Sequence, residues 1–162
     1  GLCSAVSREC SKYGYEPVML TDQLCCQAKE AGSFLASIAK THCKSGKKLA
    51  YIAGGETVVN ITGHGKGGRN QEIALSAAEG IKGMSNAAVF SIGSDGTDGP
   101  TDAAGGYSDG DTAGVLKNKG IDIFEVLKNN DAYNALKLTE GLIITGPTGT
   151  NVNDVSVLLI SD

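Results

Sequence analysis

Length, composition and charge exclude several classes of protein. The chain has 162 residues, a net charge of −4 and a hydrophobic fraction of 41%, values that are typical of one globular domain. Its basic residues form no long run and no apolar stretch approaches membrane-spanning length, so we expect no nucleic-acid partner and no membrane partner.

The five cysteines bear on the redox environment. They are odd in number, lack CxxC spacing and include the adjacent pair Cys25 and Cys26, which argues against a disulfide framework or a zinc site. We therefore expect reduced thiols in a reducing compartment, with the cytoplasm favoured and the mitochondrion left open. The chain starts at Gly1 in a polar stretch without a signal peptide, and we expect it to be a piece of a longer protein.

The first predicted elements are a short strand and an amphipathic helix. Residues 16–20 form an extended run, and Thr21 is a suitable N-cap for a helix over residues 22–43. Apolar residues recur there at spacings of three and four, which places the following on one face: Leu24, Ala28, Ala31, Leu35 and Ile38.

Two further strands and a helix are predicted next. Residues 47–53 are rich in apolar side chains, and within residues 56–62 β-branched side chains alternate with others. A strand is therefore expected on each side of Gly54 and Gly55. A glycine-rich loop then leads into a helix whose buried face is indicated by Ile73, Ala74, Ala77, Ala78 and Ile81.

The second half of the chain continues the alternation of strands and helices. An apolar strand is predicted at residues 87–92, a helix at 111–119, and a continuous or broken helix at 123–136. Short strands are predicted at residues 142–145 and 155–160. This order predicts a single α/β domain over residues 1–162, in which a mixed, mostly parallel sheet is flanked by helices as a three-layer sandwich.

Three loops rich in glycine and polar residues follow predicted strands, which is where open α/β sheets bind ligands. In the first, residues 63–72, Arg69 stands where a helix begins. Free N–H groups and the helix dipole favour an anion there, and the guanidinium suits a carboxylate or phosphate. The alternative is a flexible hairpin whose charged side chains face water. The loop matches neither a Walker A motif nor a complete GxGxxG motif.

The other two loops carry carboxylates, hydroxyls and amides. Residues 93–102 hold Asp95, Asp98 and Asp102 among glycines, which suits Mg²⁺ bound with substrate phosphates, or a base that deprotonates a hydroxyl. The alternative is a series of Asx turns. Residues 146–154 are crowded with Thr and Asn, whose side chains suit either polar ligands or turn capping.

Four motifs occur in the order found in a known family. They are Gly54-Gly55-Glu56-Thr57, the run from Gly67 to Glu72, the run from Asp95 to Gly105, and the run from Gly146 to Asp154. Together they resemble the MOFRL domain of the class II glycerate kinases, some members of which have been named hydroxypyruvate reductases. One position departs mildly from the pattern of this family, because Gly106 stands where an alanine is more usual.

The resemblance implies the C-terminal domain of a two-domain enzyme. Such an enzyme phosphorylates D-glycerate to 2-phosphoglycerate with ATP and Mg²⁺. A larger, Rossmann-like N-terminal domain outside this chain would supply the other wall of an active site that lies between the domains. The isolated chain is then expected to be inactive.

The resemblance also implies the residues of the site. Arg69, Asp95, Glu56 and Asn151 are expected to be catalytic, with Asp95 also a ligand of Mg²⁺. The residues expected to bind substrate or phosphate are Gly65, Gly67, Gly68, Asn70, Asp98, Thr148, Thr150 and Asn153. Two alternatives stay open, an NAD(P)H-dependent hydroxypyruvate reductase and a non-catalytic module that binds small anions.

Overall fold

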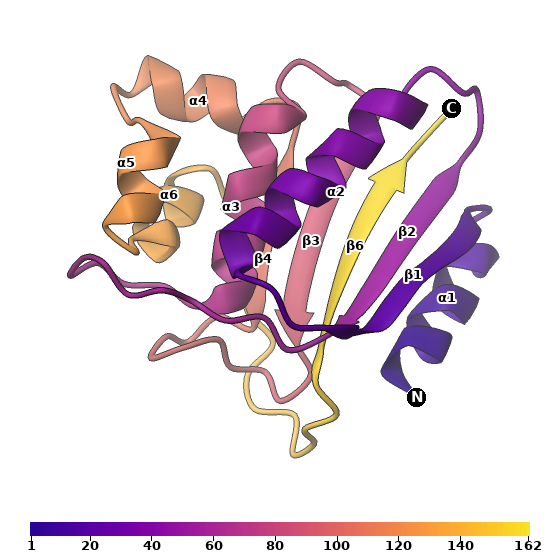
Figure 1. Cartoon of the computed structure of the whole chain (residues 1–162), viewed down its shortest axis with the longest axis horizontal. Coiled ribbons are helices and arrows are strands. Elements are labelled where there is room, and N and C mark those ends of the chain that lie inside the picture. The colour runs from indigo at the N-terminus through magenta and orange to yellow at the C-terminus, as the bar shows by residue number, and fades with distance from the viewer.

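A six-stranded mixed sheet forms the centre of the computed structural model, which describes residues 1–162 (Figure 1). The strand order is β1-β2-β6-β3-β4-β5. The elements in chain order are α1 (Leu2–Lys12), β1 (Glu16–Leu24), α2 (Ala28–His42), β2 (Leu49–Gly55), α3 (Arg69–Gly80), β3 (Ala87–Gly93), β4 (Gly105–Asp109), α4 (Thr112–Asn118), α5 (Ile123–Lys128), α6 (Ala132–Leu138), β5 (Leu142–Ile143) and β6 (Asp154–Ile160).

The strand directions correct one prediction. The α/β class and the mixed sheet flanked by helices are confirmed, but only β1 and β2 run parallel, and every other neighbouring pair is antiparallel. The expectation of a mostly parallel sheet is therefore wrong. Alternation of strands and helices favours parallel crossovers, but it does not reveal that the last strand inserts between β2 and β3, antiparallel to both.

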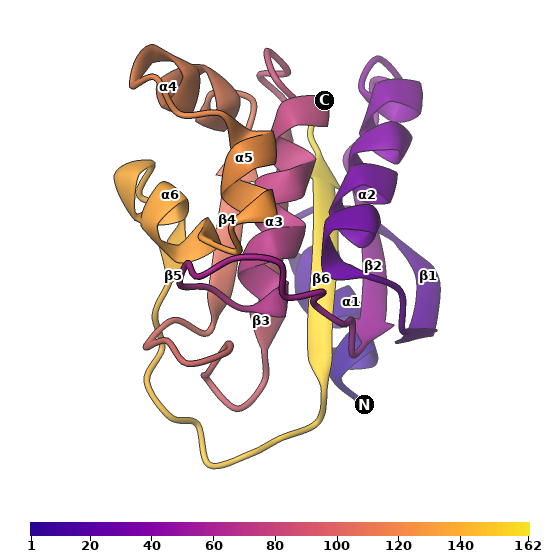
Figure 2. The ribbon, with the colours of Figure 1, turned by 60° about the vertical axis from the view of Figure 1, so that its left-hand side comes forward.

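Helices cover both faces of the sheet. On one face α2 and α3 pack over β2, β3 and β6, with Leu35, Ile73 and Leu158 among the buried side chains. On the other face α1 packs through Leu2 and Val6. Figure 2 shows α4, α5 and α6 beside α3, with α6 next to the β5 end of the sheet. None of these helices combines the length and the apolar character that crossing a membrane requires.

The N-terminal third differs from the prediction in two ways. Helix α1 was not predicted, although Leu2, Val6 and Cys10 recur every four residues and place one face against the sheet. Helix α2 begins at Ala28 instead of residue 22, since residues 22–24 extend β1 along β2.

Two strand assignments also change. No strand forms over residues 56–62, whose one β contact is an isolated bridge between Val58 and Gln27. Strand β4 lies where a loop was expected, because its two leading glycines have no strand propensity. The predicted helix at 123–136 is broken into α5 and α6 at Asn130, whose φ is 57°.

Candidate active site

Strands β2 and β3 end, and β6 begins, at the same edge of the sheet. Asp154, the first residue of β6, pairs with Gly55 on one side and Gly93 on the other. The segments that follow β2 and β3 and the segment that precedes β6 therefore gather at this edge, at the bottom of Figure 1. We call it the site edge, and the antiparallel placement of β6 is what brings its preceding loop there.

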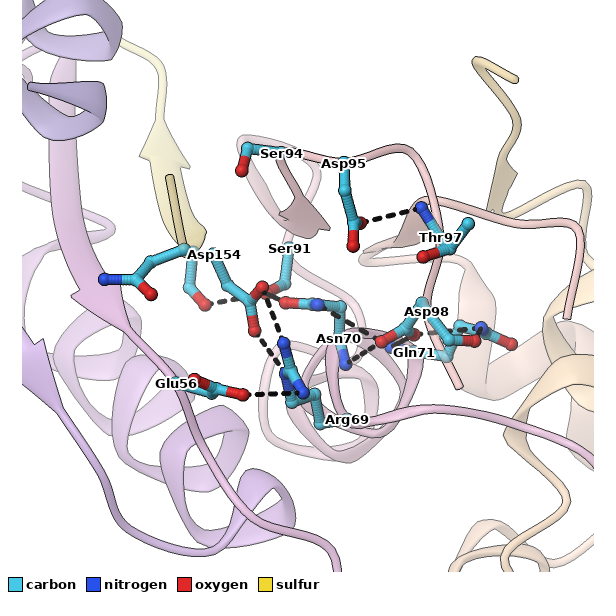
Figure 3. A network of polar contacts seen from close by, with 12 residues as sticks. Glu56, Arg69, Asn70, Gln71, Ser91, Ser94, Asp95, Thr97, Asp98 and Asp154 are labelled. Atoms are coloured by element: carbon cyan, nitrogen blue, oxygen red, sulfur yellow. Dashed lines mark hydrogen bonds and ion pairs between the residues drawn. The ribbon is translucent and has the colours of Figure 1, made fainter. Parts of the chain in front are cut away.

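Arg69, the first residue of α3, is held at the site edge by two carboxylates (Figure 3). Its Nε donates to Oδ2 of Asp154 and its second terminal nitrogen donates to Oδ1 at 3.1 Å, so the pair is bidentate. Its other terminal nitrogen lies 3.2 Å from Oε1 of Glu56. The Asp154 carboxylate raises the pKa of Arg69 above its ordinary value. A fixed, permanently charged group therefore faces the open edge with 36% of its side chain exposed.

Asp98 occupies the N-terminus of α3. Its buried carboxylate accepts hydrogen bonds from the backbone N–H groups of Asn70 and Gln71 at 3.0 and 2.9 Å and from both of their side-chain amides. Burial raises the pKa of Asp98, whereas these four donors favour its ionised form. The anion position that the sequence predicted at this helix start is thus filled by a carboxylate of the protein itself.

Buried hydroxyls tie the start of α3 to the sheet. Ser91 on β3 donates to Oδ1 of Asn70 at 2.6 Å, and its hydroxyl lies 2.7 Å from that of Ser156 on β6. Asn70 and Asp98, both expected to bind substrate, are buried and engaged within the protein. The contacts of Asn70 and Asp98 fix the first turn of α3, and therefore the position of Arg69.

The glycines of the loop before α3 meet protein backbone. A Cβ added at Gly65 would collide with Asp131, and one added at Gly68 would collide with Asp98. Gly67 is less crowded, with its nearest neighbour 3.3 Å away at the backbone nitrogen of Ala132. The absence of side chains at these positions therefore lets residues 63–68 pack onto the start of α6 and the Asp98 loop.

Asp95 lies on the second predicted loop, residues 93–102, and contacts the third. Its Oδ1 accepts from the Thr97 N–H at 3.0 Å, and its carbonyl accepts from the Thr148 N–H at 3.3 Å. That first contact, with a smaller contribution from the positive charge of Arg69, lowers the pKa of Asp95, so its carboxylate is ionised at neutral pH. Thr148 also donates to the carbonyl of Ser94, so the two loops are bonded to each other.

The remaining predicted residues lie on the loop before β6. Thr150, Asn151 and Asn153 are all exposed, and Asn153 adopts a φ of 74°. Oδ1 of Asn151 accepts from the Asn153 N–H at 3.4 Å, a long turn contact. This loop therefore presents amides and a hydroxyl to solvent at the site edge.

A pocket of about 600 Å³ opens beside Arg69, between residues 56–68 and the first turn of α3. Its lining includes Thr57, Val58, Ile61, Arg69, Glu72 and Asn130, and we call it the Glu72 pocket. Glu72 is only 4% exposed, and burial raises its pKa to about 7. Asn130 donates to its Oε1 at 3.4 Å. The lining of the pocket thus includes a buried acid whose pKa is raised toward neutral pH.

Sequence reasoning missed Asp154 and Glu72. Both fall inside motifs that were recognised, but each was assigned to the end of a loop, Asp154 to residues 146–154 and Glu72 to residues 63–72. The contact between Asp154 and Arg69 spans 85 positions, so no local pattern reveals it. No group of three or more His, Cys, Asp or Glu side chains is arranged as ligands of a metal, which leaves Asp95 as a single candidate ligand.

Comparison with known proteins gives a consistent result. The sequence model described as the MOFRL family matches residues 49–154. D-glycerate 2-kinase of Thermotoga maritima is 51% identical over 98% of this chain, and glycerate 2-kinase of Pyrococcus horikoshii is 45% identical over 98%. The chain spans 39% and 37% of the lengths of these relatives. The crystal structure of the Thermotoga glycerate kinase superposes on 98% of this chain with a TM-score of 0.93.

Proposed function

This chain belongs to the MOFRL family, and we propose that it forms the C-terminal domain of an enzyme that transfers the γ-phosphoryl group of ATP to D-glycerate, giving 2-phosphoglycerate. The observation that carries the proposal is the guanidinium of Arg69, fixed at an open edge in a chain half identical to a glycerate 2-kinase. The names of these two relatives favour the kinase over hydroxypyruvate reductase.

Phosphoryl transfer depends on positioning and on stabilising negative charge, and the site edge suits both requirements. Arg69 steadies the transferring phosphoryl group or the glycerate carboxylate, and Glu56 and Asp154 keep its guanidinium in place. Asp95 orients the glycerate hydroxyl or binds Mg²⁺. It fits the second role because Mg²⁺ usually takes one or two carboxylates together with water and phosphate oxygens.

The surrounding polar groups complete the proposed site. Asn151, Thr148, Thr150 and Asn153 present donors and acceptors to substrate from the loop before β6. Gly65, Gly67 and Gly68 shape the loop beside it, and Asn70 and Asp98 act by positioning α3. In the reaction the hydroxyl oxygen of glycerate attacks the γ-phosphorus and its proton passes to a base, for which the Asp95 carboxylate is the candidate on this chain. The bond from that phosphorus to the bridging oxygen breaks, and ADP leaves with the electron pair.

The partner required by this proposal is the rest of the protein. Because the chain spans about two-fifths of its relatives, we propose that an N-terminal Rossmann-like domain closes over the site edge and supplies further nucleotide contacts. We also propose a reducing compartment such as the cytoplasm, since the five cysteines show no disulfide pattern.

The test is ADP release by the full-length protein given ATP, Mg²⁺ and D-glycerate. We expect turnover, and we expect Arg69→Ala to lower kcat by roughly 10²- to 10³-fold, as removal of a donor that stabilises transition-state charge does elsewhere. Arg8→Ala, at an exposed position on α1, is the matched control. Near-normal turnover in a folded Arg69→Ala protein removes Arg69 from the site. No turnover with glycerate, together with oxidation of NADH on addition of hydroxypyruvate, would replace the kinase by the reductase.

A further inference from the structure

The Glu72 pocket has the wrong charge for an anion. The ionisable side chains that line it are Glu56, Glu72 and Arg69, and the charge of Arg69 is already shared between Glu56 and Asp154. The part of the pocket around Glu72 therefore does not favour a carboxylate or a triphosphate, and Arg69 is the one positively charged side chain of the lining toward which an anion could be directed. Its volume of about 600 Å³ lies within the range that holds drug-sized ligands, which is more space than a three-carbon acid fills.

The walls of the pocket suit a flat, uncharged ring. Val58 and Ile61 line one side with 54% and 79% of their surfaces exposed, and Pro100 and glycine backbone contribute further apolar surface. Exposed side chains of this kind gain most by contact with an apolar or aromatic group. An aromatic heterocycle meets that requirement without adding charge.

Two polar side chains of the pocket lining have hydrogen-bonding atoms without a partner in the protein. Glu72 has one hydrogen-bond partner, the Asn130 amide at its Oε1, so Oε2 has no partner within the protein. Thr57 lines the same pocket, and its buried hydroxyl also lacks a partner. Polar groups without a partner inside a pocket are what fix the orientation of a ligand with a polar edge.

We propose that the Glu72 pocket binds the adenine ring of ATP, with the Glu72 carboxyl paired to the base edge and the phosphates directed toward Arg69. This deepens the proposed function and rests on its use of ATP. A protonated carboxyl presents a donor beside an acceptor, which complements the N1 acceptor and the N6 amino donor of adenine. Guanine presents two donors at the corresponding edge, so it matches the ionised carboxylate instead.

The protonation of Glu72 is therefore the specificity switch. Burial raises its pKa to about 7, the amide of Asn130 and the charge of Lys29 on α2 act in the opposite direction, and Asp98 adds to the increase. Arg69 and Glu56 face the same pocket from its rim. Adenine recognition is accordingly strongest below neutral pH and weakens as Glu72 ionises.

The test is calorimetric titration of the full-length protein with adenosine, which carries no phosphate, between pH 6 and pH 8.5. Above the pKa we expect the affinity to fall by up to about tenfold per pH unit. Glu72→Leu is expected to weaken binding roughly tenfold or more, since it removes a bidentate base contact. Glu72→Gln offers the same donor and acceptor at every pH, so it retains binding and loses the pH dependence.

Glu79→Leu, on an exposed position of the same helix, is the matched control and is expected to bind adenosine as the unmodified protein does. Equal adenosine affinity in Glu72→Leu would overturn the proposal. So would an undiminished pH dependence in Glu72→Gln, or a lower kcat in Glu72→Gln with unchanged nucleoside binding. Absence of glycerate turnover, with adenosine still bound through Glu72, would count against the kinase and leave the base site standing.

Discussion

The position of Arg69 depends on Asp154, whose two carboxylate oxygens both accept hydrogen bonds from its guanidinium. Asp154 is 7% exposed, begins β6 and holds two nitrogens of the guanidinium at once. A free arginine would sample many rotamers, so this pairing fixes the direction in which the positive charge faces the site edge.

Asp154→Asn tests that dependence, because it keeps the shape of the side chain and removes its charge. Hydrogen bonds to charged groups contribute about 1.5–3 kcal/mol, so kcat/KM of the full-length protein for D-glycerate should fall roughly 10- to 100-fold. Steady-state kinetics measures this, with Asp162→Asn as the control at an exposed C-terminal position. An unchanged kcat/KM in a folded protein would show that Arg69 keeps its position without Asp154.

Glu72 should also make the stability of the chain depend on pH. Its pKa is about 7 in the folded chain against an ordinary value of 4.5, so folding favours the protonated form. The contribution is fully present below pH 4.5 and is lost as pH rises to about 7, with a total of about 3 kcal/mol. Urea unfolding at about pH 4.5 and about pH 8 should show Glu72→Gln gaining stability relative to the unmodified chain as pH rises. Glu79→Gln should show no such gain.

At the scale of elements, α2 and α3 approach closely because their interface is lined by small residues. A Cβ on Gly32 of α2 would collide with the Ser76 hydroxyl and the Ile73 carbonyl of α3. Since α3 carries Arg69 and Glu72, this contact also determines where the site residues lie relative to the sheet.

Gly32→Ala should therefore lower the free energy of unfolding by about 1–3 kcal/mol, as overpacking of a close contact does. Gly114→Ala in α4 is the matched substitution, because a Cβ there meets nothing within 4 Å. It should raise stability by up to about 1 kcal/mol through helix propensity alone. Chemical unfolding measures the free energy of unfolding of both variants. Equal effects of the two substitutions would show that α2 and α3 can move apart without loss of stability.

The same elements show what the sequence could and could not predict. Helix α3 and strand β3 were predicted within a few residues, since their apolar patterns are local. The insertion of β6 between β2 and β3 depends on pairings between residues far apart in the chain, such as Gly93 with Asp154, which no local pattern encodes. Residues 56–62 have the β-branched alternation of a strand but pair only through Val58, so pattern alone misassigned them.

Prediction of the site followed the same division. Arg69 and Asp95 were named from their motifs, and the structure brings them to one edge with Glu56. Asp98 was named as a ligand residue although its contacts are internal, because a carboxylate that caps a helix and one that binds substrate look alike in a loop rich in glycine. Their roles in catalysis stay predictions.

At the scale of the whole molecule, the site edge is open. The loops that carry Asp95 and Asn151 lie with the start of α3 at one end of the sheet (Figure 1). The first turn of α1 lies beside Gly54 at the same end, and Arg69 keeps 36% of its side chain exposed. Charge stabilisation is strong only where water is excluded and the groups are held in place. On the proposed function, an open edge with one fixed arginine is only part of an active site, and the chain spans 39% and 37% of the lengths of the two kinase relatives.

The 162-residue chain alone should consequently release ADP from ATP, Mg²⁺ and D-glycerate at least roughly 10³-fold more slowly than the full-length protein, because separated groups lose the advantage of fixed orientation. A coupled assay of both proteins at equal concentration measures this, and circular dichroism shows that the short chain is folded. Adding the N-terminal part as a separate protein should restore activity in a concentration-dependent way if the two surfaces recognise each other. Turnover by the folded short chain at the full-length rate would mean that one sheet edge holds the complete site, and the need for a second domain would be lost.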